Sequence, residues 1–219
     1  MRVEVFSVAP MGANCYIVTD EKSGQAIIID TGYPDPAALS RAAELGDRVR
    51  YILFTHRHFD HVLGAVAFKK VTGAPLVIHK LDAEGLCDPE VSLYARFADY
   101  YDIEQETAKA DLTVDEGDRL DFADGVIEVL HTPGHTEGSV CYRLGELLFT
   151  GDTLFRGSMG RVDFPSGSIK DMENSLRRLS GMDGRLAVYS GHGGATDIDT
   201  ERRTNMYMKR ANDETLCDW

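Results

Sequence analysis

Short apolar runs separated by turn residues recur through the first third of the chain, and their lengths predict strands rather than helices. One of them, VRYILFT, is apolar at nearly every position, which is typical of a strand that is buried on both faces. The predicted strands are Val3–Val8, Cys15–Thr19, Gln25–Asp30, Val49–Thr55 and Leu76–His79.

Two helices are predicted between these strands, because their apolar residues recur every three or four positions. The first spans Pro34–Gly46 and places three alanines and Leu45 on one side. The second spans Phe59–Val71, with apolar residues at 59, 62, 63, 66 and 67. It follows closely on the strand Val49–Thr55, so the short segment between them is held at both ends.

The segment 80–113 differs in character from the rest, because it is acidic and carries several aromatic residues. Its composition predicts a mostly helical insertion that lies over the core and is not a separate domain. Packing onto the core is the leading explanation for the aromatic side chains, and a wall for a bound substrate is the alternative. These aromatic residues are Tyr94, Phe97, Tyr100 and Tyr101.

The second half repeats the pattern of strands followed by helices, and no low-complexity linker separates the halves. We therefore expect one domain over residues 1–219, of α/β class, in which two facing sheets are covered by outer helices. Helices are predicted over Ile169–Leu179 and from Asp199 to about Arg210. The predicted strands are Leu120–Phe122, Val126–His131, Ser139–Leu144, Glu146–Thr150 and Arg185–Ser190.

Composition narrows the possible partners and the compartment. Hydrophobic residues make up 43% of the 219 residues and charged residues 27%, which is typical of a soluble protein. The formal net charge of -13 argues against a nucleic-acid partner, since phosphate backbones repel it. No apolar run approaches the ~20 residues that span a bilayer, and the N-terminus does not resemble a signal peptide. We therefore expect no membrane partner and a cytoplasmic location.

Four groups of histidine and aspartate carry the candidate chemistry, and each follows a predicted strand. Neutral imidazole and carboxylate are ligands that suit zinc, and also iron or manganese. Two histidines in one loop are common by chance, whereas four such groups at strand ends are specific for a metal site. The groups are His56-Arg57-His58-Phe59-Asp60-His61, Pro133-Gly134-His135-Thr136, Gly151-Asp152-Thr153 and Gly191-His192-Gly193.

The spacing within the first group predicts a three-histidine site. Alternate side chains of an extended segment share a face, so His56 and His58 can bind one ion together. His135 can complete this site with a third imidazole.

The same loop also predicts a second ion nearby. A helix that begins at Phe59 redirects Asp60 and His61 toward a second position, where His192 can join them. Asp152 is the natural bridge, because each of its carboxylate oxygens can bind one ion. Two ions ~3.5–4 Å apart can hold a water as a bridging hydroxide at neutral pH.

The order of these groups resembles the metallo-β-lactamase superfamily over nearly the whole chain. The segment GDTLFRGSMGRVDFP at 151–165 and the sequence ERRTN at 201–205 are similar to the short, single-domain members of its glyoxalase II-like (hydroxyacylglutathione hydrolase-like) branch. The resemblance implies an αββα sandwich of two mixed sheets and two divalent metal ions. Zinc is the metal expected first, with iron or manganese as alternatives. The implied ligands are His56, His58 and His135 for one ion, Asp60, His61 and His192 for the other, and Asp152 for both.

The same resemblance also concerns the substrate. In glyoxalase II a cationic residue after this segment holds a carboxylate of glutathione, and Arg161 stands at that place. Two tyrosines of that family are replaced here, by Asp163 and by the glycines after His192. The resemblance implies hydrolysis of acylated glutathione, whereas another low-molecular-weight thiol fits the missing tyrosines better. Arg161 is the candidate substrate contact in either case. A structural ion pair between Arg161 and Asp163 is the alternative.

The leading functional hypothesis is a metal-dependent hydrolase that cleaves a small-molecule thioester with a small acyl group, by attack of a metal-bridging hydroxide. Asp60 and Asp152 are the carboxylates expected to take part in catalysis. The first alternative is a mononuclear-iron persulfide dioxygenase of the same branch, which would use His56, His135 and Asp152. The second alternative is a metal-binding module without catalytic activity. The oligomeric state stays open.

A few remaining polar residues have ordinary structural explanations as well. Asp30 ends a predicted strand, and is either a turn residue or a hydrogen-bond partner of a metal ligand. Arg57 is expected at the surface or in a salt bridge. For His79 and His131 we expect structural roles.

Overall fold

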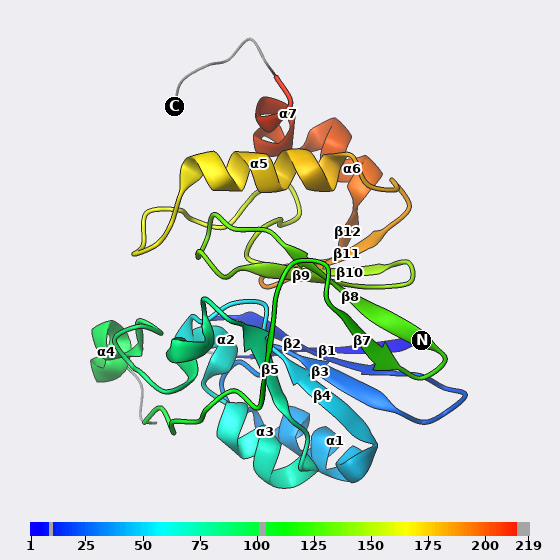
Figure 1. Cartoon of the computed structure of the whole chain (residues 1–219), viewed down its shortest axis with the longest axis vertical. Helices are drawn as coiled ribbons and strands as arrows, with labels where there is room; N and C mark the ends of the chain where they lie inside the picture. Colours follow the sequence, from blue (N-terminus) through cyan, green and yellow to red (C-terminus); the bar gives the residue numbers. More distant parts are fainter. Residues whose placement is uncertain (9–10, 101–103, 214–219) are drawn as a thin grey trace.

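The computed structural model describes residues 1–8, 11–100 and 104–213. These residues form two six-stranded sheets that face each other, and helices cover the outer face of each sheet (Figure 1). This arrangement confirms the predicted four-layer αββα sandwich. Tyr101, one of the aromatic residues of the segment 80–113, lies outside the described residues.

The first sheet has the strand order β1-β2-β3-β4-β5-β6, so each strand lies beside its neighbours in sequence. Its first three strands pair antiparallel, whereas β3 to β6 run parallel. The parallel part brings the carboxyl ends of β3, β4 and β5 to one edge. The strands are β1 (Arg2–Val8), β2 (Ala13–Thr19), β3 (Ala26–Ile29), β4 (Val49–Leu53), β5 (Leu76–His79) and β6 (Leu112–Val114).

The second sheet has the order β12-β11-β10-β9-β8-β7. Strands β7 to β10 alternate in direction, β11 runs parallel to β10, and β12 runs antiparallel to β11. As a result, the carboxyl ends of β8, β10 and β11 share one edge. The strands are β7 (Arg119–Phe122), β8 (Gly125–His131), β9 (Val140–Leu144), β10 (Leu147–Gly151), β11 (Ala187–Ser190) and β12 (Thr196–Asp197).

The helices form the two outer layers, with α1 and α3 on the first sheet and α5, α6 and α7 on the second (Figure 1). None of the helices in the described ranges is long and apolar enough to cross a membrane. The helices are α1 (Pro36–Leu45), α2 (Phe59–Val62), α3 (Ala65–Thr72), α4 (Tyr94–Phe97), α5 (Ile169–Ser180), α6 (Ile198–Thr204) and α7 (Met206–Ala211).

Strand β3 shows why the sequence produces layers. Its alternate side chains point to opposite faces, so Ala26 and Ile28 pack in the cluster with α1 and α3, whereas Ile27 and Ile29 pack between the two sheets. All four side chains are buried. A strand that is covered on both faces must be apolar at every position, which explains the continuous apolar run in the sequence.

The helix predicted over Phe59–Val71 is wrong in one respect, because the structure divides it into α2 and α3 at Leu63–Gly64. A Cβ atom at position 64 would lie 3.0 Å from the carbonyl oxygen of Gly32 and 3.1 Å from the Thr31 side chain. The Gly64 amide donates a hydrogen bond of 2.6 Å to that same carbonyl oxygen. This close contact with the loop after β3 breaks the helix, and the apolar spacing gave no sign of it.

Two other predictions of helical structure also need correction. The segment 80–113 is not mostly helical in its described part, where it forms single turns, including α4, and ends in the unpredicted strand β6. The helix predicted from Asp199 to Arg210 is two helices, because Asn205 caps the second one by accepting hydrogen bonds from the amides of Tyr207 and Met208. The short strand β12 was not predicted either.

Candidate metal centre

All seven predicted ligands lie together, at the edge where β4, β8, β10 and β11 end. They form three overlapping groups, and within each group the ligand atoms lie within 4.8 Å of one another. The groups are His56, His58 and His135; His56, His61 and Asp152; and Asp60, His61 and His192.

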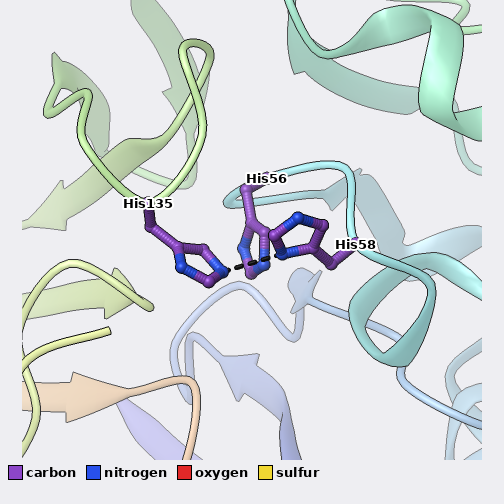
Figure 2. A group of neighbouring side chains, drawn as sticks. All are labelled: His56, His58 and His135. Carbon is purple, nitrogen blue, oxygen red and sulfur yellow. Dashed lines mark hydrogen bonds between the residues drawn. The ribbon is translucent and has the colours of Figure 1, made fainter. Parts of the chain in front are cut away.

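The three-histidine group draws its members from both sheets. His56 and His58 follow β4 in the first sheet, and His135 lies between β8 and β9 in the second. Figure 2 shows the three rings converging, with His58 Nδ1 and His135 Nε2 only 2.8 Å apart. All three residues are buried. The loop after β4 thus presents two imidazoles to one point, as the extended spacing predicted.

Asp152 lies between this group and the second one. Its Oδ1 is 3.4 Å from His61 Nε2, and its Oδ2 is 3.5 Å from His135 Nε2 and 3.6 Å from His192 Nε2. Asp60 Oδ2 is 3.3 Å from His192 Nε2. A carboxylate that faces three imidazoles with two oxygens has the geometry expected of a bridge between two ions.

Unsatisfied polar atoms test whether these residues fit metal ions. Within the described part of the chain, His56 Nε2, His58 Nε2, His61 Nε2 and Asp152 Oδ1 are buried without a hydrogen-bond partner. Buried polar atoms are nearly always paired, so four unpartnered atoms on neighbouring candidate ligands require a missing partner. Imidazole nitrogen and carboxylate oxygen are the donors that zinc, iron and manganese accept. The site therefore fits divalent ions.

The charges at the site point the same way. Burial, together with the neighbouring imidazoles, lowers the pKa of His56 and of His58 well below the ordinary value, so both rings are neutral and able to bind a metal. Burial alone would lower the pKa of His61 as well, but the carboxylates of Asp152, Asp60 and Asp30 outweigh it and raise this pKa to about 10. So much negative charge around one imidazole calls for a cation.

The carboxylate of Asp60 is ionised. Burial would raise its pKa, but the nearby imidazoles of His61 and His192 outweigh burial and hold the pKa below the ordinary value. Asp60 can therefore act as an anionic ligand throughout the neutral pH range.

Asp30 contacts the candidate ligand His61. This matches its predicted role as a hydrogen-bond partner of a metal ligand. His61 Nδ1 is 2.9 Å from Asp30 Oδ2, and the same carboxylate accepts hydrogen bonds from the amide and hydroxyl of Thr55 at 2.8 and 2.7 Å. A carboxylate on the far nitrogen fixes the orientation of an imidazole and directs its Nε2 toward a metal. The backbone carbonyl of Arg161 does the same for His135, whose Nδ1 is 2.7 Å away.

Gly191 shows how tightly the backbone surrounds the site. A Cβ atom there would lie 2.1 Å from Asp152 Oδ1 and 2.8 Å from His61 Cε1. Position 191 therefore accepts only glycine if the carboxylate is to keep its place.

Asp82, which the sequence patterns did not indicate, connects two of the ligand loops. Its fully buried carboxylate accepts hydrogen bonds from the Arg57 amide at 3.0 Å and from the Thr136 hydroxyl at 2.6 Å. Arg57 forms the expected salt bridge, at 3.2 Å to Asp82, but it is buried instead of lying at the surface. Only the place of Asp82, shortly after a strand, could have marked it in the sequence.

Arg161, the candidate substrate contact, lines the pocket beside the ligands. Both of its guanidinium contacts to Asp163 are 2.7 Å, and the guanidinium carbon lies 3.8 Å from the centre of the Phe164 ring. The structure thus contains the ion pair between Arg161 and Asp163 that was the alternative to a substrate contact. Arg161 nevertheless lines the pocket.

His79 and His131 lie outside the ligand groups. Their rings stack with centroids 4.3 Å apart, and His131 Nε2 is 2.8 Å from the carbonyl oxygen of Glu137. These contacts match the structural roles expected for both residues.

Comparisons with known proteins agree with this geometry. The hydroxyacylglutathione hydrolase GloC of Haemophilus influenzae is 30% identical over 224 residues, which cover 95% of this chain and 98% of that protein. The crystal structure of BLEG-1, described as a B3 metallo-β-lactamase, has a TM-score of 0.86 at 28% identity and covers 94% of this chain and 99% of that one. TTHA1623, crystallised in a di-iron-bound form, has a TM-score of 0.80 at 33% identity and covers 94% and 100%.

A family model described as the metallo-beta-lactamase superfamily matches residues 8–192, a range that contains all seven candidate ligands. The match covers most of the chain, and the fold and the ligand order agree with it. The chain therefore belongs to the metallo-β-lactamase superfamily.

Proposed function

We propose that the protein is a metal-dependent hydrolase that cleaves thioesters of a small acyl group. The observation that carries the proposal is the meeting of seven imidazole and carboxylate side chains, four of which have a buried polar atom without a hydrogen-bond partner. A relative of nearly the same length is named hydroxyacylglutathione hydrolase, an enzyme that acts on a thioester, and this supports the choice of bond.

The two ions would be held by the sets that the sequence suggests. His56, His58 and His135 would hold one; Asp60, His61 and His192 would hold the other; Asp152 would contact both. Zinc is our first choice, and the di-iron form of TTHA1623 supports iron as an alternative. When bound, such ions supply Lewis acidity at the scissile carbonyl and lower the pKa of a water molecule toward neutrality.

The residues of the chain prepare the site for this reaction. Asp60 and Asp152 are the carboxylates that face the pocket, and we assign to them the orientation of the attacking water. Asp30 holds the His61 ring in place through Nδ1. The departing thiolate is a good leaving group, so the reaction needs little assistance from an acid.

Release of thiol tests this proposal. The zinc-loaded protein should liberate free thiol from at least one member of a panel of acyl thioesters, measured with a thiol-reactive dye. His56→Ala should abolish that release, because it removes a ligand from the three-histidine group. A loaded protein that releases no thiol from any thioester would overturn the proposal.

A mononuclear-iron persulfide dioxygenase is the rival function. His56 and His135 lie with ring centroids 4.7 Å apart, and Asp152 Oδ2 is 3.5 Å from His135 Nε2, so three suitable ligands are present. A single iron held by His56, His135 and Asp152 does not explain why Asp60, His61 and His192 also converge. Oxygen uptake with a persulfide substrate distinguishes the two functions.

A further inference from the structure

The pocket beside the candidate ligands is small and mostly apolar. Its volume is about 240 Å³, below the roughly 300–1,000 Å³ that is usual for small-molecule sites. Bound ions would fill part of that space. The lining residues other than candidate ligands are Met11, Phe59, Leu93, Phe97, Arg161 and Phe164, of which all but Arg161 are apolar.

Four of these residues form what we call the apolar wall: Met11, Leu93, Phe97 and Phe164. Leu93, Phe97 and Phe164 belong to one cluster that packs around Phe59, and the Phe97 and Phe59 rings stack with centroids 5.2 Å apart. The segment 80–113 therefore contributes both to packing and to the pocket. Of its described aromatic residues, Tyr94 is buried and Tyr100 is 79% exposed, so Phe97 alone among these lines the pocket.

A backbone hydrogen bond holds the Leu93 part of the wall beside the ligands. The carbonyl oxygen of Ser92 accepts a hydrogen bond of 2.9 Å from the amide of Phe59, next to the ligand Asp60. Leu93 adopts a left-handed conformation, with φ of 67°, although its side chain is only 3% exposed. That conformation strains a leucine, unlike glycine or asparagine, so the packing of the Leu93 side chain must offset the strain.

The wall offers no partner to a charged group. The only arginine or lysine among the lining residues, Arg161, makes two contacts to Asp163 and lies over Phe164. The lining carboxylates Asp60 and Asp152 belong to the candidate metal site. An anionic group placed against this wall would lose its hydration without gaining a partner.

We propose that the apolar wall selects the acyl group of the substrate, and that the preferred acyl group is an uncharged chain of a few carbons. The inference rests on the proposed function, because it presumes that a thioester carbonyl lies at the metal site. It adds the chemical class of the acyl group and names the residues that recognise it.

Thioesters of N-acetylcysteamine test the wall, because this thiol is uncharged and only the acyl group varies. For the zinc-loaded protein, kcat/KM should rise about threefold to fourfold with each methylene from acetyl to butyryl. The succinyl thioester, which has the same number of carbons as butyryl, should be cleaved at least about tenfold more slowly. Equal rates for butyryl and succinyl would overturn the proposal.

Two variants of the apolar wall and one control variant test whether these residues cause the preference for longer acyl groups. Phe97→Ala and Leu93→Gly should lower the ratio of butyryl to acetyl kcat/KM about threefold to tenfold. Glycine at position 93 accepts the positive φ, so that variant keeps the backbone. Tyr100→Ala, in the same segment but outside the pocket lining, should leave the ratio unchanged. Wall variants that behave like Tyr100→Ala would contradict the proposal.

Binding of uncleavable analogues separates this inference from the proposed function. Ketones in which a methylene replaces the thioester sulfur can be measured by calorimetry with the same variants. The butyryl analogue should bind at least about tenfold more tightly than the succinyl analogue, and Phe97→Ala should reduce that difference. If the analogues show this preference while no thioester is cleaved, the proposed selectivity of the apolar wall is retained and the proposed hydrolysis is ruled out. Equal binding of both analogues would overturn the proposal that the apolar wall selects the acyl group.

Discussion

Asp152 joins the two halves of the site, because its two oxygens face different imidazoles. We predict that Asp152→Ala loses both ions and all thiol release, whereas His192→Ala loses mainly one ion. Elemental analysis after loading with zinc and removal of free metal measures both outcomes. An Asp152→Ala protein that retains two ions would show that this carboxylate is not a bridge.

Asp30 acts through His61 and not on the substrate. Asp30→Asn keeps the size of the side chain and tolerates the positive φ of 51°, but it places an amide among three donors. We predict about tenfold to hundredfold weaker binding of one ion, with the fold retained. Metal titration and circular dichroism test this. Unchanged affinity would mean that Asp30 serves only the turn.

Substitutions of Arg161 and Asp163 show whether Arg161 contacts the substrate or serves only in a structural ion pair. If Arg161 holds an anionic leaving group, Arg161→Ala should raise KM for a carboxylate-bearing thioester by roughly 1.5–3 kcal/mol, about tenfold to a hundredfold. Asp163→Ala should lower the same KM, because it releases the guanidinium. Metal content should not change in either variant. A KM that neither substitution alters would assign Arg161 to the ion pair alone.

At the scale of elements, the ligand loops of the two sheets are linked through Asp82, beyond the end of β5. It accepts hydrogen bonds from the loop after β4 and from the loop between β8 and β9. We predict that Asp82→Ala destabilises the metal-free protein by roughly 1–3 kcal/mol, because the Arg57 amide and the Thr136 hydroxyl lose their buried acceptor. Urea unfolding measures this. Asp82→Asn should lower the free energy of unfolding by less. Equal stability of the unsubstituted protein and both variants would show that Asp82 does not connect the ligand loops.

Strands and helices differed in how well the sequence predicted them. Within the predicted strand Gln25–Asp30, residues Ala26–Ile29 are apolar on both faces, and their burial between two layers follows directly from that pattern. The break at Gly64 could not be predicted, because it arises from contact with Gly32, which is distant in sequence. The turns of the segment 80–113 follow from tertiary contacts such as the hydrogen bond between Phe59 and Ser92.

For the whole molecule, metal ions should contribute to stability, because their ligands come from both sheets. Each site should add about 2.7 kcal/mol when the free metal is a hundred times its dissociation constant. We predict that a chelator lowers Tm and that added zinc restores it. Calorimetry with and without chelator measures this. An unchanged Tm would mean that the seven residues do not bind metal between the sheets.

The candidate ligands could be predicted from the sequence because each follows a strand that ends at the same edge. The loop after β4 carries its ligands at spacings that fix where they point, as His56 and His58 show. The contacts of Asp82 and the apolar wall were not recognisable in the same way. They depend on which loops meet in space. Leu93 carries no local sequence signal, and the only signal at Asp82 is its place shortly after a strand.

Metal-dependent thioester hydrolysis and its rival are distinguished by measuring thiol release and oxygen uptake in one experiment. The protein is loaded with zinc or with iron and supplied with the butyryl thioester of N-acetylcysteamine or with a persulfide. We predict thiol release from the thioester, dependent on bound metal and lost in Asp152→Ala, with no oxygen uptake from the persulfide. Oxygen uptake by the iron-loaded protein without thiol release would contradict the account and establish the dioxygenase.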